Sequence, residues 1–203
     1  RVYRHRTRPP QDVPGNVLPY TAIVKPVVFW NITSLCNLSC RHCYLDAGPA
    51  CETDRELSTQ DGLALIEDLG RMGVPLVIIS GGEPLLRYDI WELLAHAHEH
   101  HLALALSSNG TLINRETAER LKAAGVEYVG ISLDAANRES HESFRRVPGC
   151  FDAALAGLQH CREAGLKTGV RFTVTGENCR GVRDLIRLSH EIQADRFCIY
   201  WLV

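Results

Sequence analysis

The chain has 203 residues, of which 45% are hydrophobic and 23% are charged, as is typical of a globular domain with a hydrophobic core. Its formal net charge of −2 excludes binding to nucleic acid or to an anionic membrane through bulk electrostatics, so we expect neither as a partner. The sequence has no apolar run of about 18 residues and no secretory signal pattern, so neither a transmembrane helix nor secretion is predicted.

The start of the chain differs in composition from the rest. Residues 1–21 contain four prolines and no hydrophobic period, and we predict that they form an N-terminal extension or linker. Residues 22–203 are predicted to form one core domain. Because the chain begins with Arg1 and ends at Val203 within an apolar run, we expect it to be a fragment of a longer protein, with a C-terminal domain missing.

From residue 22 onward, apolar runs of strand length alternate with helical segments. Most runs are continuously apolar, as in strands buried on both faces, and they fall at residues 27–32, 76–80, 102–107, 128–133, 169–174 and 196–203. Helices are predicted between them, at residues 58–73, 88–100, 114–125, 151–165 and 180–193. This alternation predicts an α/β fold with a parallel sheet, either doubly wound or closed toward a barrel.

The predicted helices have recognisable ends. Ser58 and Asn114 are predicted N-caps, and glycines follow the last turns. In the first helix, an apolar stripe is predicted to face the core and consists of Leu65, Ile66, Leu69 and Met72.

Small and polar residues collect where the predicted strands end. They include the segments 80–83 and 107–110, Ser132 with Asp134, and Thr173. In parallel α/β folds, ligands bind at the carboxyl edge of the sheet. Polar residues are also favoured in loops, so the pattern by itself leaves a site and ordinary loops as alternatives.

Three cysteines follow the first strand, in the segment CNLSCRHC. Cys36, Cys40 and Cys43 have the spacing C-x3-C-x2-C. Three thiolates can hold three irons of a [4Fe–4S] cluster and leave one iron open, as in catalytic metal sites. A zinc site completed by a distant residue and three unrelated thiols are the alternatives. The eight cysteines are too few for a disulfide scaffold, which favours a reducing cytoplasm.

This segment resembles the C-x3-C-x-φ-C motif of the radical S-adenosylmethionine (SAM) superfamily. The segment GGEP at residues 81–84 resembles the glycine-rich element that follows the second strand in that family. Residues 107–111 and 130–135 fall where the family has its third- and fourth-strand motifs. The resemblance extends from about residue 25 to 203 and implies a partial (β/α)6 TIM-like barrel.

The resemblance implies a role for each residue of the cysteine motif. Cys36, Cys40 and Cys43 would ligate a [4Fe–4S] cluster, whose open iron would bind the amino and carboxylate groups of SAM. His42 stands at the φ position, which is usually aromatic, and its imidazole would stack against the adenine of SAM.

The glycine-rich segment and the next loop would contact SAM. Gly81 and Gly82 would let the backbone approach the methionine moiety, and Glu83 would accept a hydrogen bond from the SAM amino group. Pro84 would fix this loop.

Two polar residues at later strand ends, Asn109 and Ser132, are further expected SAM contacts, and Asp134 or Arg171 could join them. For Asn109 followed by Gly110, a simple turn is the alternative.

The implied activity is reductive cleavage of SAM into methionine and a 5′-deoxyadenosyl radical, which abstracts hydrogen from a substrate. A low-potential donor such as flavodoxin or ferredoxin would supply the electron. Longer segments, such as residues 144–175, resemble the branch that modifies propionate side chains of siroheme-derived tetrapyrroles in heme d1 and heme synthesis. That branch carries a SPASM-type C-terminal extension with an auxiliary cluster, which would lie beyond Val203. Maturation of a ribosomally made peptide and a non-catalytic zinc-binding module are the alternatives.

Other features have simpler interpretations. The histidines of HAHEHH, at residues 96–101, invite a second metal site, but histidines near a helix C-terminus are also favoured by the helix dipole. Arg145, Arg146 and Lys167 are predicted to be solvated, with substrate carboxylates as alternative partners.

The five cysteines outside the motif form no pattern of their own. Cys161 and Cys198 are predicted to pack in the core, Cys51 and Cys150 to lie in loops, and Cys179 to lie near a helix start.

Overall fold

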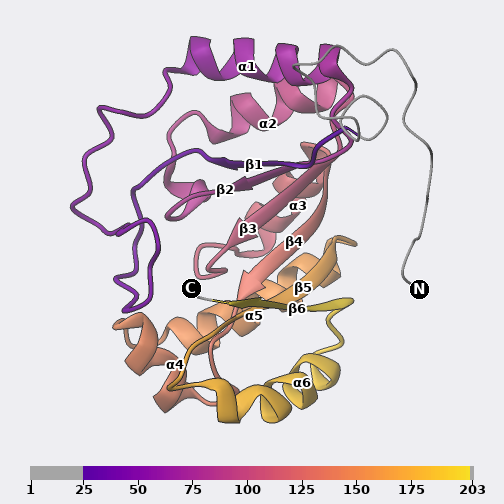
Figure 1. The fold of residues 1–203 in the computed structure, drawn as a ribbon. Helices are drawn as coiled ribbons and strands as arrows, with labels where there is room; N and C mark the ends of the chain where they lie inside the picture. The colour runs from indigo at the N-terminus through magenta and orange to yellow at the C-terminus, as the bar shows by residue number, and fades with distance from the viewer. Residues whose placement is uncertain (1–24, 202–203) are drawn as a thin grey trace, which may run out of the picture.

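A computed structural model describes residues 25–201, and the predicted extension at residues 1–21 lies outside them (Figure 1). Six parallel strands form one sheet in chain order. They are β1 (Val28–Asn31), β2 (Val77–Ser80), β3 (Leu104–Ser108), β4 (Val126–Ser132), β5 (Lys167–Val174) and β6 (Arg196–Trp201). The sheet curls into an open half-barrel, which confirms the predicted partial (β/α)6 barrel and excludes the flat doubly wound alternative.

The helices cover the convex face of the sheet (Figure 1). They are α1 (Thr59–Met72), α2 (Ile90–Glu99), α3 (Arg115–Ala123), α4 (Arg138–Arg145), α5 (Cys150–Glu163) and α6 (Val182–Glu191), with short 3₁₀ turns η1 (Pro84–Leu86) and η2 (Cys179–Gly181). The sequence predicted five of these helices and missed α4. Its eight residues, RESHESFR, contain one apolar side chain, too few to form a hydrophobic stripe.

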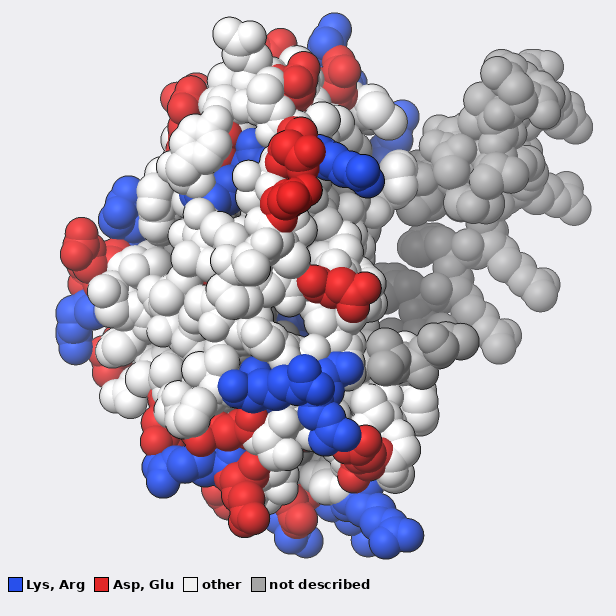
Figure 2. Space-filling model, turned by 90° about the vertical axis from the view of Figure 1, so that its left-hand side faces the viewer, with Lys and Arg blue, Asp and Glu red and all other residues white. Residues whose placement is uncertain are grey.

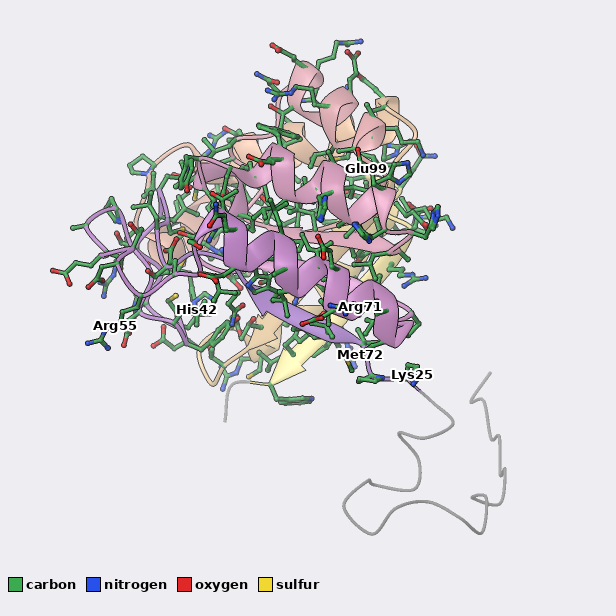
Figure 3. All side chains as sticks on the ribbon, turned by 90° about the horizontal axis from the view of Figure 1, so that it is seen from above. Lys25, His42, Arg55, Arg71, Met72 and Glu99 are labelled. Atoms are coloured by element: carbon green, nitrogen blue, oxygen red, sulfur yellow. The ribbon has the colours of Figure 1, made fainter. Side chains whose placement is uncertain are left out.

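The predicted helix ends are confirmed. Ser58 Oγ accepts a hydrogen bond from the backbone of Asp61, and Gly73 adopts the left-handed conformation that ends α1. Asn114 caps α3 in the same way, accepting from the backbone of Thr117. One prediction for α1 was wrong, because Met72 is exposed at the last residue of the helix (Figure 3).

The main core lies between the sheet and the helices. Alternate strand residues such as Trp30, Ile79, Leu106 and Ile131 point into it and are buried. The edge strands β1 and β6 alternate between less and more exposed side chains, so the prediction that strands are buried on both faces holds for the middle of the sheet but not for its edges. The concave face is therefore free to form a site.

A buried ion pair fastens the start of α2 to the first strand. Arg87 Nε donates to Asp89 Oδ1 over 2.6 Å, and both side chains are about 5% exposed. The other guanidinium nitrogens donate to the carbonyl oxygens of Ile32 (2.7 Å) and Leu57 (2.8 Å). The pair thus links the end of β1, the start of α1 and the start of α2, and no pattern in the sequence predicted it.

Within residues 25–201, no helix is both long enough and apolar enough to cross a membrane.

Candidate active site

A cavity of about 560 Å³ opens on the concave side of the sheet, at its carboxyl edge. Viewed from that edge, the middle of the molecule is largely uncharged, and the charged side chains gather above and below it (Figure 2). Eight of the nine predicted site residues border the cavity, namely Cys36, Cys40, His42, Cys43, Gly81, Gly82, Asn109 and Ser132. The ninth, Glu83, does not. Parallel strands bring these residues together because their carboxyl ends meet at one edge.

The three cysteines of the motif lie in the loop after β1, and none forms a disulfide. Two of the sulfurs accept backbone N–H groups: Cys36 Sγ from Leu38 at 3.4 Å and Cys43 Sγ from Ala47 at 3.3 Å. Burial raises the pKa of Cys36, because a thiolate loses solvation there. A bound metal cation has the opposite effect, because it stabilises the thiolate and so lowers the pKa of a cysteine that binds it. Free thiols beside backbone donors and bordering one cavity fit the ligand set of an iron–sulfur cluster.

Gly81 and Gly82 hold this loop against the end of β2. A Cβ on Gly81 would lie 2.5 Å from the carbonyl oxygen of Thr33, and one on Gly82 would lie 2.4 Å from that of Leu35. Gly81 also has a φ of +140°, which side chains disfavour. Both glycines border the cavity, but their nearest neighbours are the protein's own backbone. Close approach of the cysteine loop by itself therefore requires glycine here.

Replacing Gly82 by alanine is expected to push Leu35, and with it the adjoining Cys36, out of position. Overpacking of this kind destabilises by about 1–3 kcal/mol. We expect Gly82→Ala to lower both the thermal midpoint and the iron taken up during anaerobic reconstitution. Gly48→Ala is the matched control, since Gly48 lies in the same loop with nothing within 4 Å of an added Cβ. Equal iron contents in the two variants would contradict the steric argument.

Glu83 is fully buried and ties the end of β2 to the end of β3. Its carboxylate accepts hydrogen bonds from Ser108 Oγ (2.9 Å), from the backbone N–H of Asn109 (2.8 Å) and from that of Leu85 (3.3 Å). Burial nevertheless raises its pKa to about 7. Because Glu83 does not border the cavity, its expected bond to the SAM amino group stays a prediction.

The buried carboxyl group makes stability depend on pH. Between about pH 4.5 and pH 7 the folded chain holds a proton on Glu83 that the unfolded chain has released, so stability falls as pH rises through this window, by about 3 kcal/mol. His141 acts in the opposite sense, because burial lowers its pKa to about 4. We expect Glu83→Gln to remove only the first effect. Thermal midpoints of the iron-free protein from pH 4.5 to 8 would show it, and identical profiles for wild type and variant would contradict the assignment.

Asn109 lies between the third-strand loop and the cysteine loop. Its side-chain oxygen accepts from the backbone N–H of Thr111 (2.9 Å), as in the simple turn given as an alternative. Its amide nitrogen donates to Asn37 Oδ1 (2.9 Å) and lies 3.8 Å from Cys36 Sγ. The turn is therefore present, and it also places an N–H donor beside a cysteine sulfur.

His42 lies at the cavity wall with its imidazole edge against the Phe144 ring, at a centroid distance of 5.3 Å. Its Nε2 lies 3.5 Å from Asp134 Oδ1, and burial lowers its pKa. Asp134 does not border the cavity. It pairs instead with Arg145, whose Nε donates to Asp134 Oδ2 over 2.7 Å.

Two predictions about this region were wrong. Arg145 was expected to be solvated, but it is 7% exposed and borders the cavity, because the unpredicted helix α4 turns it inward. Arg146 is exposed, as expected. Cys150 was expected in a loop, but it is the first residue of α5 and packs with Leu38 and Ala47 beneath the cysteine loop. Arg145 is the last residue of α4, a helix with a single apolar side chain, so no hydrophobic pattern in the sequence indicated that it is buried.

Comparisons with known proteins agree with this geometry. The family model of the Radical SAM superfamily matches residues 30–189. The chain is 46% identical over 196 residues to the Fe-coproporphyrin III synthase of Methanosarcina barkeri, covering 97% of this chain and 49% of the relative. It is 41% identical over 179 residues to the pre-heme d1 synthase of Dinoroseobacter shibae, covering 88% and 44%. The mycofactocin maturase MftC of Mycolicibacterium smegmatis is 41% identical over 150 residues, covering 73% and 38%.

The fold is similar to that of a solved structure. Streptococcus suis SuiB bound to S-adenosylmethionine superposes with a TM-score of 0.75 at 22% identity, covering 87% of this chain and 40% of SuiB. The chain spans about half the length of the curated relatives it matches. On the match of the family model and the identity to these relatives, the chain belongs to the radical SAM superfamily.

Proposed function

We propose that this chain is the catalytic core of a radical SAM enzyme that modifies a siroheme-derived tetrapyrrole in heme or heme d1 synthesis, acting on propionate side chains. The observation that carries the proposal is the convergence of three free cysteines and the predicted SAM-contacting residues on one cavity. The names of the relatives with 46% and 41% identity support the substrate class. Residues 22–203 would form the core domain, preceded by an extension at residues 1–21.

Cys36, Cys40 and Cys43 would hold a [4Fe–4S] cluster, and SAM would bind beside it in the cavity. When bound and reduced, these groups supply the 5′-deoxyadenosyl radical that abstracts hydrogen from substrate. A low-potential protein such as flavodoxin or ferredoxin would supply the electron. The free cysteines fit the reducing cytoplasm as the compartment.

The residues around the cysteines would control polarity at the cluster. Backbone N–H groups at Leu38 and Ala47 donate toward the sulfurs, and the Arg145 guanidinium opposes the rise in the pKa of Cys40 that burial causes. Such donors and charges set the potentials of iron–sulfur clusters. Apolar packing of Leu38, Ala47 and Cys150 beneath the loop would exclude water from this side.

The open side of the cavity suits a flat, anionic substrate. Phe29, Tyr44 and Trp201 border it and are exposed, offering aromatic faces. Arg171 also borders it, with its guanidinium 4.6 Å from the centroid of the Tyr200 ring. A guanidinium held by stacking keeps its N–H groups available for a carboxylate such as a propionate.

The test is to reconstitute the protein anaerobically, as the full-length polypeptide, and to titrate it with a siroheme-type macrocycle and separately with a peptide. We expect SAM cleavage on reduction and binding of the macrocycle alone. Peptide maturation is the second candidate, supported by the similarity to MftC, and binding of a ribosomally made precursor peptide without the macrocycle would establish it instead. Stoichiometric zinc without iron in material never exposed to air would replace both with a zinc-binding module.

A further inference from the structure

Three potential metal ligands lie together on the outer helices, away from the candidate active site. His96 and His100 are four residues apart at the end of α2, so they share one face of the chain there. Glu67 faces them from α1. One ligand atom from each of the three residues lies within 4.8 Å of the others.

His96 and Glu67 lie close to each other but form no hydrogen bond. His96 Nε2 is buried, has no hydrogen-bond partner in the described part of the chain, and lies 3.5 Å from Glu67 Oε1. Imidazole nitrogen and carboxylate oxygen each bind zinc at about 2.0–2.2 Å, so two such ligands of a tetrahedral ion lie about 3.4 Å apart. The observed separation thus fits a shared metal ion, and it leaves a polar atom unsatisfied without one.

Gly70 of α1 leaves room for the third potential ligand, His100, to lie close to the other two. A Cβ on Gly70 of α1 would lie 3.3 Å from the carbonyl oxygen and 3.8 Å from Nδ1 of His100, so the absence of a side chain lets His100 lie against α1. The rings of His96 and His100 are 4.4 Å apart between centroids. Glu67 and His100 are each partly exposed, so rotation of these side chains can close the site.

A carboxylate also lies behind the central ligand. Glu99 Oε2 is 3.9 Å from His96 Nδ1, the ring nitrogen that points away from Glu67. Histidines that bind metals commonly donate their other N–H to a carboxylate, which fixes the tautomer and the ring orientation. Two carboxylates and two imidazoles form a favourable environment for a divalent cation.

We propose that Glu67, His96 and His100 bind one divalent transition-metal ion of the zinc class, which joins α1 to α2. In a βα barrel the C-terminal ends of the helices, such as the end of α2 with His96 and His100, lie at the amino edge of the sheet, where residues serve stability rather than catalysis. Figure 3 labels Glu99 at the end of α2 and His42 in the cysteine loop, in separate parts of the molecule. The ion would be structural, and the site is independent of the cluster and SAM.

The test is to equilibrate the cluster-loaded protein with Zn²⁺, remove excess by gel filtration, and measure zinc and iron per chain. We expect one zinc in addition to the iron, and a thermal midpoint raised by Zn²⁺. Glu67→Gln, His96→Gln and His100→Gln should each weaken zinc binding by about tenfold or more, because even residues behind metal ligands contribute that much. Iron content should not change, which separates this proposal from the function proposed above.

His101→Asn is the matched control, because His101 belongs to the same histidine-rich segment, is exposed, and has a φ of +59° that asparagine tolerates. Glu67→Gln is the variant that should still fold normally, because an exposed side chain is replaced by one of the same shape. Its loss of zinc binding would therefore reflect the loss of a ligand. No zinc bound by the wild type, or equal zinc binding by all four variants and the wild type, would overturn the site. In that case the only role of these histidines would be a favourable interaction with the dipole at the C-terminal end of α2.

Discussion

Replacing Cys36, Cys40 and Cys43 together by alanine is expected to abolish iron binding and SAM cleavage. Reconstituted wild-type protein should contain about four irons per chain, and the triple variant close to none, because no other cysteines of the chain are grouped at cluster spacing. Iron and sulfide analysis, the visible absorption of the cluster, and methionine release on reduction measure the outcome. Full iron incorporation in the triple variant would refute the ligand assignment.

The matched control for this result is Cys51→Ala. Cys51 lies in the same loop, and its thiol donates to the backbone oxygen of Asp46 at 3.2 Å rather than bordering the cavity. We expect this variant to keep its iron and its SAM cleavage. Loss of iron in both variants would show that the loop tolerates no change, in which case single Cys→Ser variants would separate ligation from folding.

Replacing Asp89 by alanine is expected to destabilise the protein by about 3–5 kcal/mol, because it leaves the buried Arg87 guanidinium without its carboxylate. The remaining bonds to the carbonyl oxygens of Ile32 and Leu57 do not neutralise the charge, and the next carboxylate, Glu56, is 3.7 Å away. Denaturant unfolding of the iron-free protein, with the midpoint and slope fitted separately, measures the loss.

Asp68→Ala provides the comparison. Asp68 pairs with Arg71 one turn away on α1, and both side chains are mostly exposed, so we expect a change within about 0.5 kcal/mol. In the double variant Arg87→Met with Asp89→Ala, part of the stability should return because no charge remains buried. A loss for Asp89→Ala as small as that for Asp68→Ala would mean that water reaches Arg87 and that the pair does not fasten β1 to α2.

The sequence predicted most of the fold because the relevant signals are local. Apolar runs marked the strands, and the caps at Ser58 and Asn114 fixed where α1 and α3 begin. Helix α4 was missed because its stability comes from an asparagine cap and from packing of Phe144 and His141 rather than from a hydrophobic stripe. Such packing depends on residues that are distant in the chain, and the spacing of apolar residues within a short segment does not reveal them.

The candidate site, like the fold, could be predicted from the sequence only in part. The spacing of Cys36, Cys40 and Cys43 by itself determined that three thiols lie close together after a strand, and a parallel sheet places that strand end beside the next ones. Only the tertiary structure decided that Gly82 makes room for the cysteine loop and that Glu83 is buried away from the cavity. It also decided that Arg145 turns inward and that Glu67 faces His96. These facts depend on the register and curl of the sheet and on the packing of its helices, which bring residues together across long distances in the sequence.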